Sequence, residues 1–164
     1  MPNKPLLVID TSPLVALVAA LDDFSVVGEV AMLVVPGEVI AELKAGAGRD
    51  ETARIVEAAA GCVVRSPITS LPLALGRILG SGEAAVIHTA LTEGIATVVI
   101  DERKGRRVAG LHGLRVTGSL GLLLALHRRG LVPSVSEAVA RMKAKGIHLD
   151  DALVQEALAA QKEQ

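Results

Sequence analysis

The segment TVVIDERKGRRVAG, residues 97–110, joins an apolar run to an acid and then to a group of cations. The run Val98–Ile100 is apolar at every position, which is typical of a strand buried on both faces in a parallel sheet. It stops at Asp101, and four basic residues follow within six positions: Arg103, Lys104, Arg106 and Arg107. Because ligands of open α/β sheets bind beyond the carboxyl ends of the strands, this segment predicts a parallel sheet with a charged site at its edge.

Short β-branched runs of this kind alternate with longer helical patterns over the first 130 residues. Five runs are predicted to be strands: Leu6–Ile9, Met32–Val35, Cys62–Arg65, Thr97–Ile100 and Leu114–Val116. Six segments are predicted to be helices: Pro13–Leu21, Pro36–Ala45, Glu51–Ala60, Gly82–Glu93, Arg103–Leu111 and Ser119–Arg128. Strands separated by helices imply parallel crossovers, so we expect an α/β fold, a three-layer α/β/α sandwich with a mainly parallel five-stranded sheet.

The pattern becomes purely helical after residue 130. Ser134 and Glu137 have the spacing of a capping box. Two apolar faces follow, one of Val135, Ala138, Val139 and Met142, and one of Leu149, Leu153, Val154, Ala157 and Leu158. We therefore expect a single domain over residues 1–164, with an α/β core at 1–130 and a C-terminal helical extension at 131–164.

The composition restricts the functions open to the chain. Hydrophobic residues make up 51% of it, the net charge is −1, and there is one Phe with no Tyr or Trp. The core must therefore be aliphatic, and the chain lacks the aromatic platforms on which proteins stack single-stranded bases. A nucleic-acid partner would need a local basic patch, because the overall charge gives no attraction.

The N-terminal segment and the cysteine content bear on the compartment. Cys62 is the single cysteine, which excludes an intramolecular disulfide, as expected in a reducing cytoplasm. Lys4 and the apolar residues after it resemble a signal peptide, but Asp10 and Pro13 interrupt the run. The run is also far below the ~20 residues that span a bilayer. We expect a cytoplasmic protein that does not enter the membrane.

Four acids fall where a parallel sheet would collect them. Asp10 and Asp101 end predicted strands, Glu42 lies in the helix after the second strand, and Glu83 lies in the first turn of another helix. Carboxylates ~5 Å apart repel by roughly 3 kcal/mol per pair at an effective dielectric of 20, so such a cluster favours a bound cation. The four histidines are scattered, which disfavours zinc, and oxygen donors suit Mg²⁺ or Mn²⁺.

Each acid taken alone has a structural explanation. Asp10 and Asp101 would each cap the helix that follows, with Thr11 and Ser12 as rivals of Asp10. Glu83 would complement a helix N-terminus. Glu42 would be an exposed helix residue, with Glu38, one turn earlier, as the functional acid instead. The cluster is the stronger interpretation because it accounts for all four positions together.

At this point the sequence resembles a family. Five segments occur in order: VIDTSPLVAL, VPGEVIAEL, GSGEAAVIHTAL, VVIDERKGRRVA and GLRVTGSLGLLL. They resemble the PIN-domain proteins, and most closely a prokaryotic branch related to the toxin ribonucleases of toxin–antitoxin pairs. The resemblance extends from about Leu6 to beyond Arg128, and the segment KGIHLDDALVQEAL is similar to the ending of that branch.

The resemblance implies a catalytic metal site. Its ligands would be Asp10, Glu42, Glu83 and Asp101, supported by the hydroxyl group of Ser12, with Thr11 beside it. The chain departs from the family by having Glu83 where many members have Asp, and by lacking a second Asp near Glu102 or Arg103. The number of metal ions is therefore left open.

The cations after Asp101 have two interpretations. Arg103, Arg106 and Arg107 share one face of a helix at i, i+3 and i+4, and with Lys104 they would bind RNA phosphates. Gly105 would allow a tight turn or a close approach to a phosphate. The alternative is a solvated helix face. Two further cations, Lys44 and Arg49, would extend the patch, whereas Thr117 or Ser119 is expected to be an N-cap.

These observations predict a metal-dependent endoribonuclease that hydrolyses RNA phosphodiester bonds. Asp10, Glu83 and Asp101 would be the main ligands, and Glu42 would complete the outer ring or orient the attacking water. One alternative is a phosphohydrolase with an aspartate nucleophile, but such enzymes usually have a second Asp where this chain has Ser12. The other is a non-catalytic PIN-like module that binds nucleic acid or protein.

The expected partners follow from the same hypothesis. RNA would be the substrate, and the family resemblance implies a small antitoxin-like protein that blocks the acidic site. The C-terminal helices and exposed apolar residues would hold a homodimer.

Overall fold

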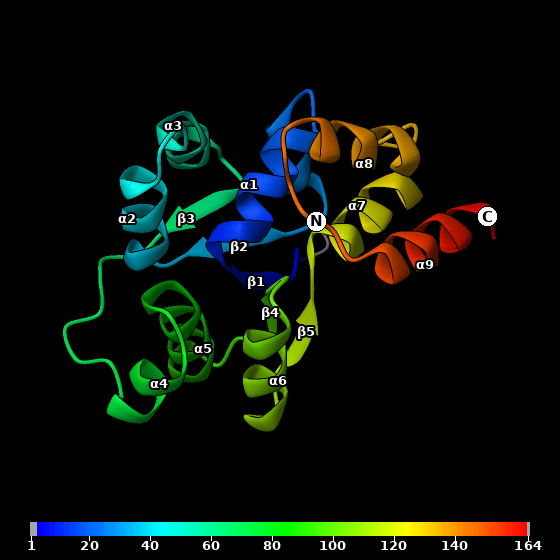
Figure 1. Ribbon diagram of the computed structural model, residues 1–164. Coiled ribbons are helices and arrows are strands. Elements are labelled where there is room, and N and C mark those ends of the chain that lie inside the picture. The colour runs from blue at the N-terminus through cyan, green and yellow to red at the C-terminus, as the bar shows by residue number, and fades with distance from the viewer. Residues whose placement is uncertain (1–2, 164) are drawn as a thin grey trace.

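A five-stranded sheet forms the centre of the computed structural model, which describes residues 3–163 (Figure 1). Across the sheet the order is β3 (Cys62–Val64), β2 (Met32–Val35), β1 (Leu6–Ile9), β4 (Thr97–Val99) and β5 (Arg115–Thr117). Every pair of neighbouring strands is parallel, so the sheet is parallel throughout. This confirms the predicted α/β/α sandwich with a mainly parallel sheet. Met1, Pro2 and Gln164, which the predicted single domain includes, lie outside the described residues.

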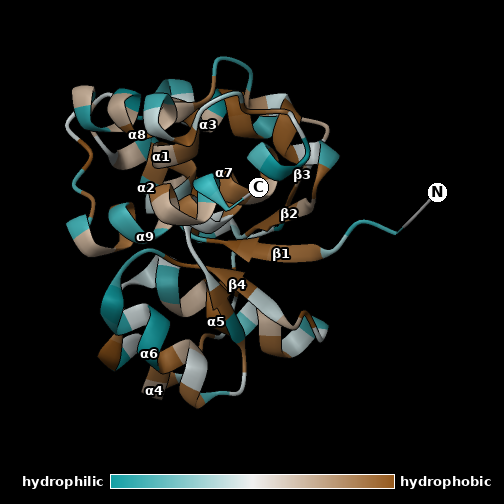
Figure 2. Cartoon of the chain, turned by 90° about the vertical axis from the view of Figure 1, so that its right-hand side faces the viewer, coloured by the Kyte–Doolittle hydropathy of each residue, from teal (hydrophilic) through white to brown (hydrophobic). Residues whose placement is uncertain are grey.

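Helices cover both faces of the sheet (Figures 1 and 2). One side carries α1 (Thr11–Ala20), α2 (Gly37–Ala45), α3 (Asp50–Ala58) and α7 (Ser119–Arg128). The other side carries α4 (Leu73–Ile78), α5 (Ser81–Glu93) and α6 (Arg103–Leu111). The C-terminal helices α8 (Val135–Ala144) and α9 (Asp151–Lys162) pack against α1 and α7, respectively. A 3₁₀ helix, η1 (Phe24–Glu29), and α4 were not predicted.

The N-terminal ends of two helices show how the sequence sets the boundaries. Helix α1 begins at Thr11, two residues earlier than predicted, because Pro13 is tolerated in a first turn, where its missing N–H is not needed. The predicted capping box of α8 forms, since the Glu137 N–H donates to the Ser134 hydroxyl at 3.2 Å.

The predicted buried face of α9 is wrong at Leu153, which is 44% exposed.

The chain reverses its direction across the sheet between β1 and β4. From β1 it adds β2 and β3 on one side, and it then crosses to add β4 and β5 on the other. Ile9 pairs with Val99, and the Asp10 N–H donates to the Val99 carbonyl at 3.0 Å. The residues that follow β1 and β4 therefore leave the sheet side by side at its switch point, where ligands of open α/β folds bind.

The core is aliphatic, as the composition predicts. Val8, Ile9, Val98 and Val99 on the two central strands are fully buried, and Figure 2 shows β1 in the hydrophobic colour. Phe24, the single Phe, Tyr or Trp of the chain, is the first residue of η1 and is buried. Among residues 3–163, no helix combines the length and apolar character needed to cross a membrane.

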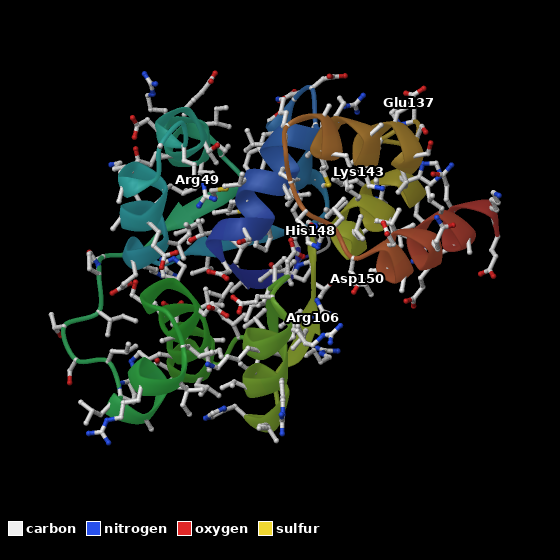
Figure 3. All side chains as sticks on the ribbon, in the orientation of Figure 1. Arg49, Arg106, Glu137, Lys143, His148 and Asp150 are labelled. Atoms are coloured by element: carbon white, nitrogen blue, oxygen red, sulfur yellow. The ribbon has the colours of Figure 1, made fainter. Side chains whose placement is uncertain are left out.

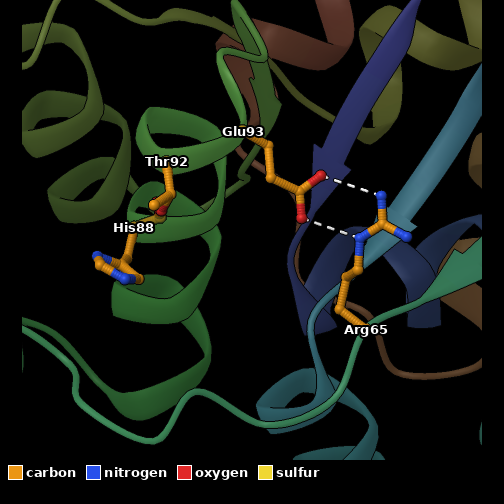
Figure 4. A network of polar contacts seen from close by, with 4 residues as sticks. All are labelled: Arg65, His88, Thr92 and Glu93. Atoms are coloured by element: carbon orange, nitrogen blue, oxygen red, sulfur yellow. Dashed lines mark hydrogen bonds and ion pairs between the residues drawn. The ribbon is translucent and has the colours of Figure 1, made fainter.

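A paired charge ties the edge strand β3 to α5 (Figure 4). Arg65, just after β3, donates from Nε and Nη2 to the two carboxylate oxygens of Glu93, at 2.9 and 3.0 Å. Thr92 donates to the His88 carbonyl one turn earlier in the same helix. This bidentate pair satisfies both partners at the surface, so it anchors the end of α5 to the edge of the sheet.

Candidate active site

Asp10 lies at the centre of the acidic cluster. It directly follows β1 and is only 5% exposed. Burial, with smaller contributions from the charges of Glu42, Asp101 and Glu102, raises the pKa of Asp10 to about 7, against a backbone hydrogen bond at Thr11 that lowers it. Since a carboxyl responds to other charges only when they are close, the structure brings Glu42 and Asp101 together around Asp10 and adds Glu102 to them.

Glu83 enters the same cluster from the first turn of α5. Burial raises the pKa of its carboxyl, followed by the charges of Asp10 and Glu102, and Glu42 adds a smaller push. Its Oε2 atom is buried and finds no hydrogen-bond partner among residues 3–163. A buried carboxylate oxygen without a donor is costly, so this group favours either a proton or a bound cation.

Glu42 is held by hydrogen bonds between two helices. Its carboxylate accepts from the Thr11 hydroxyl at 2.6 Å, the Ser81 hydroxyl at 3.1 Å and the Gly82 N–H at 2.9 Å. Glu42 is therefore not the free exposed residue of the alternative explanation. Its rival Glu38 has a different contact, because it accepts the Ile68 N–H and so fixes the loop before α4.

Asp101 contacts a helix other than the one that follows it. Its Oδ1 accepts the Ser119 N–H at 2.8 Å, which places the carboxylate at the N-terminus of α7. The N-cap of α6 is Glu102, which makes no side-chain capping bond, and Asp10 likewise makes none at the N-cap of α1. The local capping explanation is thus wrong for Asp101, whereas Asp10 does occupy the N-cap position of α1, without a side-chain capping bond among residues 3–163.

The expected N-caps of α7 are also wrong. Gly118 occupies that position, so neither Thr117 nor Ser119 does. Ser119 is the first residue of the helix, and its side chain is only 1% exposed. Its buried hydroxyl finds no hydrogen-bond partner in the described part of the chain. The N-terminus of α7 is therefore satisfied by a carboxylate from another segment, that of Asp101.

Three of the acids rest directly on glycines. A Cβ atom on Gly82 would lie closer than 3.0 Å to the Glu42 carboxylate. The same holds for Gly105 against Glu83 and for Gly118 against Asp101. Gly105, in α6, therefore makes room for the Glu83 carboxylate. The prediction was that it would allow a tight turn or a close approach to a phosphate. The sequence shows a glycine close to each motif, but it does not indicate which acid each glycine contacts.

The predicted cationic residues of α6 lie in different surroundings. Arg103 is 94% exposed and pairs with Asp150 at 3.7 Å. Arg106 is half-buried, and its Nη1 donates to the Ile100 carbonyl at 2.8 Å, beside Asp101. Lys104 and Arg107 are exposed on α6 and do not line the groove described below, as far as residues 3–163 define it.

A groove of about 1010 Å³ opens beside the acids. Its lining includes Ser12, Asp101 and Glu102 from the site and Arg103 and Arg106 from α6. It also includes residues of two connecting segments: Arg49 between α2 and α3, and Lys145, His148 and Asp150 between α8 and α9. Of the two cations expected to extend the patch, Arg49 lines the groove, whereas Lys44 pairs with Glu57 at 2.8 Å.

The carboxylates fit a hard divalent ion in kind. The atoms of these carboxylates that could bind a metal ion are all oxygens. One of them, Glu83 Oε2, is buried without a hydrogen-bond partner among residues 3–163. Over the same residues, no three acidic, histidine or cysteine side chains stand together in a ready metal-binding arrangement. Glu42 and Asp101 instead point toward their own hydrogen-bond donors. The set therefore has the right chemistry, and binding an ion would require these side chains to turn.

The fold and this site define an α/β/α protein with a cluster of acids at the switch point of a parallel sheet. The chain belongs to the PIN-domain family, because a family model described as a PIN domain matches residues 6–163. In a comparison with curated proteins, none matches the chain. PIN domains are generally nucleases and typically use divalent metal ions, so the fold is a nuclease fold.

Proposed function

We propose that the chain is a metal-dependent endoribonuclease that hydrolyses RNA phosphodiester bonds. The observation that carries the proposal is the state of the buried acids. Asp10 has its pKa raised to about 7 by burial and by three neighbouring acids, and the buried Oε2 of Glu83 has no partner within residues 3–163. A site kept in this state costs stability unless protons or a cation bind, so it has the character of a binding site rather than of a structural element.

The proposed ligands are Asp10, Glu83 and Asp101, with Glu42 completing the set or orienting the attacking water. An ion such as Mg²⁺ or Mn²⁺, when bound, lowers the pKa of water and stabilises charge on the phosphate. Glu42 and Glu83 have the longer side chains and would turn most easily toward the ion. Thr11 supports Glu42 through its hydroxyl, and Ser12 is exposed in the groove.

The arginines of α6 would bind the substrate next to the acids. Arg106 is fixed by the Ile100 carbonyl beside Asp101 and would present its remaining N–H groups to a phosphate. Arg103 is nearly fully exposed, and its surface pair with Asp150 is weak enough to be replaced by a phosphate contact. Lys104 and Arg107 would contribute only general attraction, because they lie outside the groove.

The test is cleavage of end-labelled structured and unstructured RNAs with EDTA, Mg²⁺ or Mn²⁺. The wild-type protein should cut only with metal, and Asp10→Asn and Asp101→Asn should not cut. The control is Asp151→Asn, since that side chain is 93% exposed at the start of α9. Cleavage that is unaffected by EDTA and by both variants contradicts the proposal, and calorimetry without Mn²⁺ binding favours a non-catalytic binding module.

We further propose that the enzyme acts as the toxin of a toxin–antitoxin pair, restrained by a small antitoxin-like protein. The support is the order of sequence motifs, and the test is growth arrest on expression that depends on Asp10. We also propose a homodimer, supported by exposed apolar side chains such as Leu73, which is 71% exposed on α4. Its mass in solution would decide this point.

A further inference from the structure

The segment between α8 and α9 is a fixed wall of the groove. Lys145 ends α8, and Gly146 follows with a φ of +79°, which favours glycine. The Ile147 N–H donates to the Met142 carbonyl at 3.1 Å, and the Ile147 side chain packs against the core. These contacts form a helix-terminating turn, so the backbone that carries Lys145 is held in place.

The other end of this segment is fixed as well. The carboxylate of Asp150 accepts the N–H groups of Ala152 and Leu153 at 2.9 and 3.3 Å and so caps α9. Lys145 and His148, between the two fixed ends, are exposed and line the groove. The segment therefore presents two cationic or potentially cationic side chains on an ordered backbone.

Arg49 adds a cation from the turn between α2 and α3. The methylene groups of its side chain lie over Gly46, since a Cβ on Gly46 would come within 2.7 Å of Arg49 Cδ. In the view of Figure 3, Arg49 lies to the left of His148 and Arg106 lies below it. The cations thus extend along the groove beyond the two arginines of α6.

The charges of this part of the groove are not balanced by the protein. Among residues 3–163, Arg49 and Lys145 have no ion pair, whereas Asp150, the acid of the same segment, pairs with Arg103. The remaining acids of the lining, Asp101 and Glu102, belong to the cluster around Asp10. An anionic ligand that passes the acids would therefore meet unpaired cations on this side too.

We propose that Arg49, Lys145 and His148 form a second phosphate-binding segment, which holds the RNA backbone along the groove beyond Arg103 and Arg106. The inference rests on the proposed ribonuclease function, and it assigns the substrate contacts to residues outside the sequence motifs. Among residues 3–163 the groove lining includes no Phe, Tyr or Trp, so we expect such contacts to position the strand rather than to read its bases. The loss of affinity on mutation should therefore be similar for RNAs of different sequence.

The experiment measures RNA binding in EDTA, which stops cleavage, at several salt concentrations. The variants are Arg49→Gln/Lys145→Gln and the triple variant that adds His148→Gln. The control is Arg54→Gln/Lys162→Gln, which removes two exposed cations outside the groove. The double variant should bind roughly tenfold more weakly, and the slope of log affinity against log salt should fall by about 0.7 for each lost contact, while the control is unchanged.

A second variant separates the position of Arg49 from its charge. Gly46→Ala keeps every charge, and the φ of −78° at Gly46 suits alanine, but the new methyl group must displace the Arg49 side chain. We expect weaker binding and a smaller slope, as if one contact were lost. Unchanged melting temperature and unchanged Mn²⁺ binding by calorimetry would show that the fold and the acids are intact.

The two proposals fail in different ways. If the groove variants keep wild-type affinity and slope while Arg103→Gln/Arg106→Gln binds more weakly, the second segment does not bind phosphate and the ribonuclease proposal stands. If the wild-type protein neither binds nor cleaves RNA with or without Mn²⁺, both proposals are overturned.

Discussion

Two charged regions of the molecule are built in opposite ways. At the edge of the sheet, Arg65 and Glu93 form a bidentate pair, with side chains 42% and 34% exposed. At the switch point, Asp10 is 5% exposed and is surrounded by charges of its own sign. The first region satisfies its own charges, and the second leaves Glu83 Oε2 without a partner among residues 3–163.

The difference separates a structural contact from a binding site. A surface pair of opposite charges needs nothing from outside the chain, and its contribution to stability is small. A buried group of like charges lowers stability and is relieved only by protons or by a cation. Mutations in the two regions should consequently have opposite effects on stability, and only one region should affect activity.

The largest expected effect is on catalysis at Asp10. Asp10→Asn should lower the rate of metal-dependent RNA cleavage by about 10³-fold or more, about 4 kcal/mol of barrier, because a ligand and its charge are lost. The measurement is single-turnover cleavage with Mn²⁺. Arg65→Gln serves as the comparison and should cleave at the wild-type rate. A similar loss in both variants would remove the distinction between the two regions.

The pH dependence of stability should differ next. Burial and neighbouring acids raise the pKa of Asp10 from 3.8 to about 7, so the folded chain keeps a proton that the unfolded chain has lost. Metal-free stability should therefore fall as the pH rises from about 4 to about 7, by at most roughly 1.4 kcal/mol per pH unit, and then level off. Melting curves in EDTA should show a smaller fall for Asp10→Asn, and parallel curves would contradict this.

A smaller effect is expected from a methyl group on α6. Gly105→Ala would push the carboxylate of Glu83 away, because the new Cβ would overlap its Oε2. Cleavage should fall by roughly 10- to 100-fold, as expected for a catalytic group that is misplaced by about 1 Å. The matched control is Gly110→Ala in the same helix, where a Cβ meets nothing within 4 Å. Equal rates for the two variants would show that Glu83 needs no such room.

The smallest effect should come from the surface pair. Arg65→Gln should lower the free energy of unfolding by only about 0.2–1 kcal/mol, because both partners remain in contact with water. Urea denaturation measures this change, and high salt should reduce it further. A loss of several kcal/mol would mean that the pair at β3 has a larger structural role than its exposure indicates.

The sequence predicts the strands and the meeting of the acids well, for a physical reason. Apolar runs such as Leu7–Ile9 and Val98–Val99 are buried on both faces, and parallel strands end at one edge. An acid that directly follows such a run must then lie at that edge, which is why Asp10 and Asp101 were found. Glu42 and Glu83 were harder to place, because helix residues reach the edge only through packing.

Features that depend on three-dimensional contacts could not be predicted. The bond between Asp101 and Ser119 spans 18 positions, and no local pattern indicates that an acid after β4 meets α7. The sequence marks Glu102 only as a position near which the family has a second Asp. In the structure, its charge raises the pKa of both Asp10 and Glu83. The groove wall at Lys145 and His148 likewise depends on how α8 and α9 pack on the α/β core.

The glycines beneath the acids change how related sequences should be judged. A homologue could keep all four carboxylates and still lose activity if alanine or serine replaced Gly82, Gly105 or Gly118, since a Cβ there would fill the space that the carboxylates of Glu42, Glu83 and Asp101 occupy. We therefore expect glycine at these three positions to be as diagnostic of an intact site as the acids themselves.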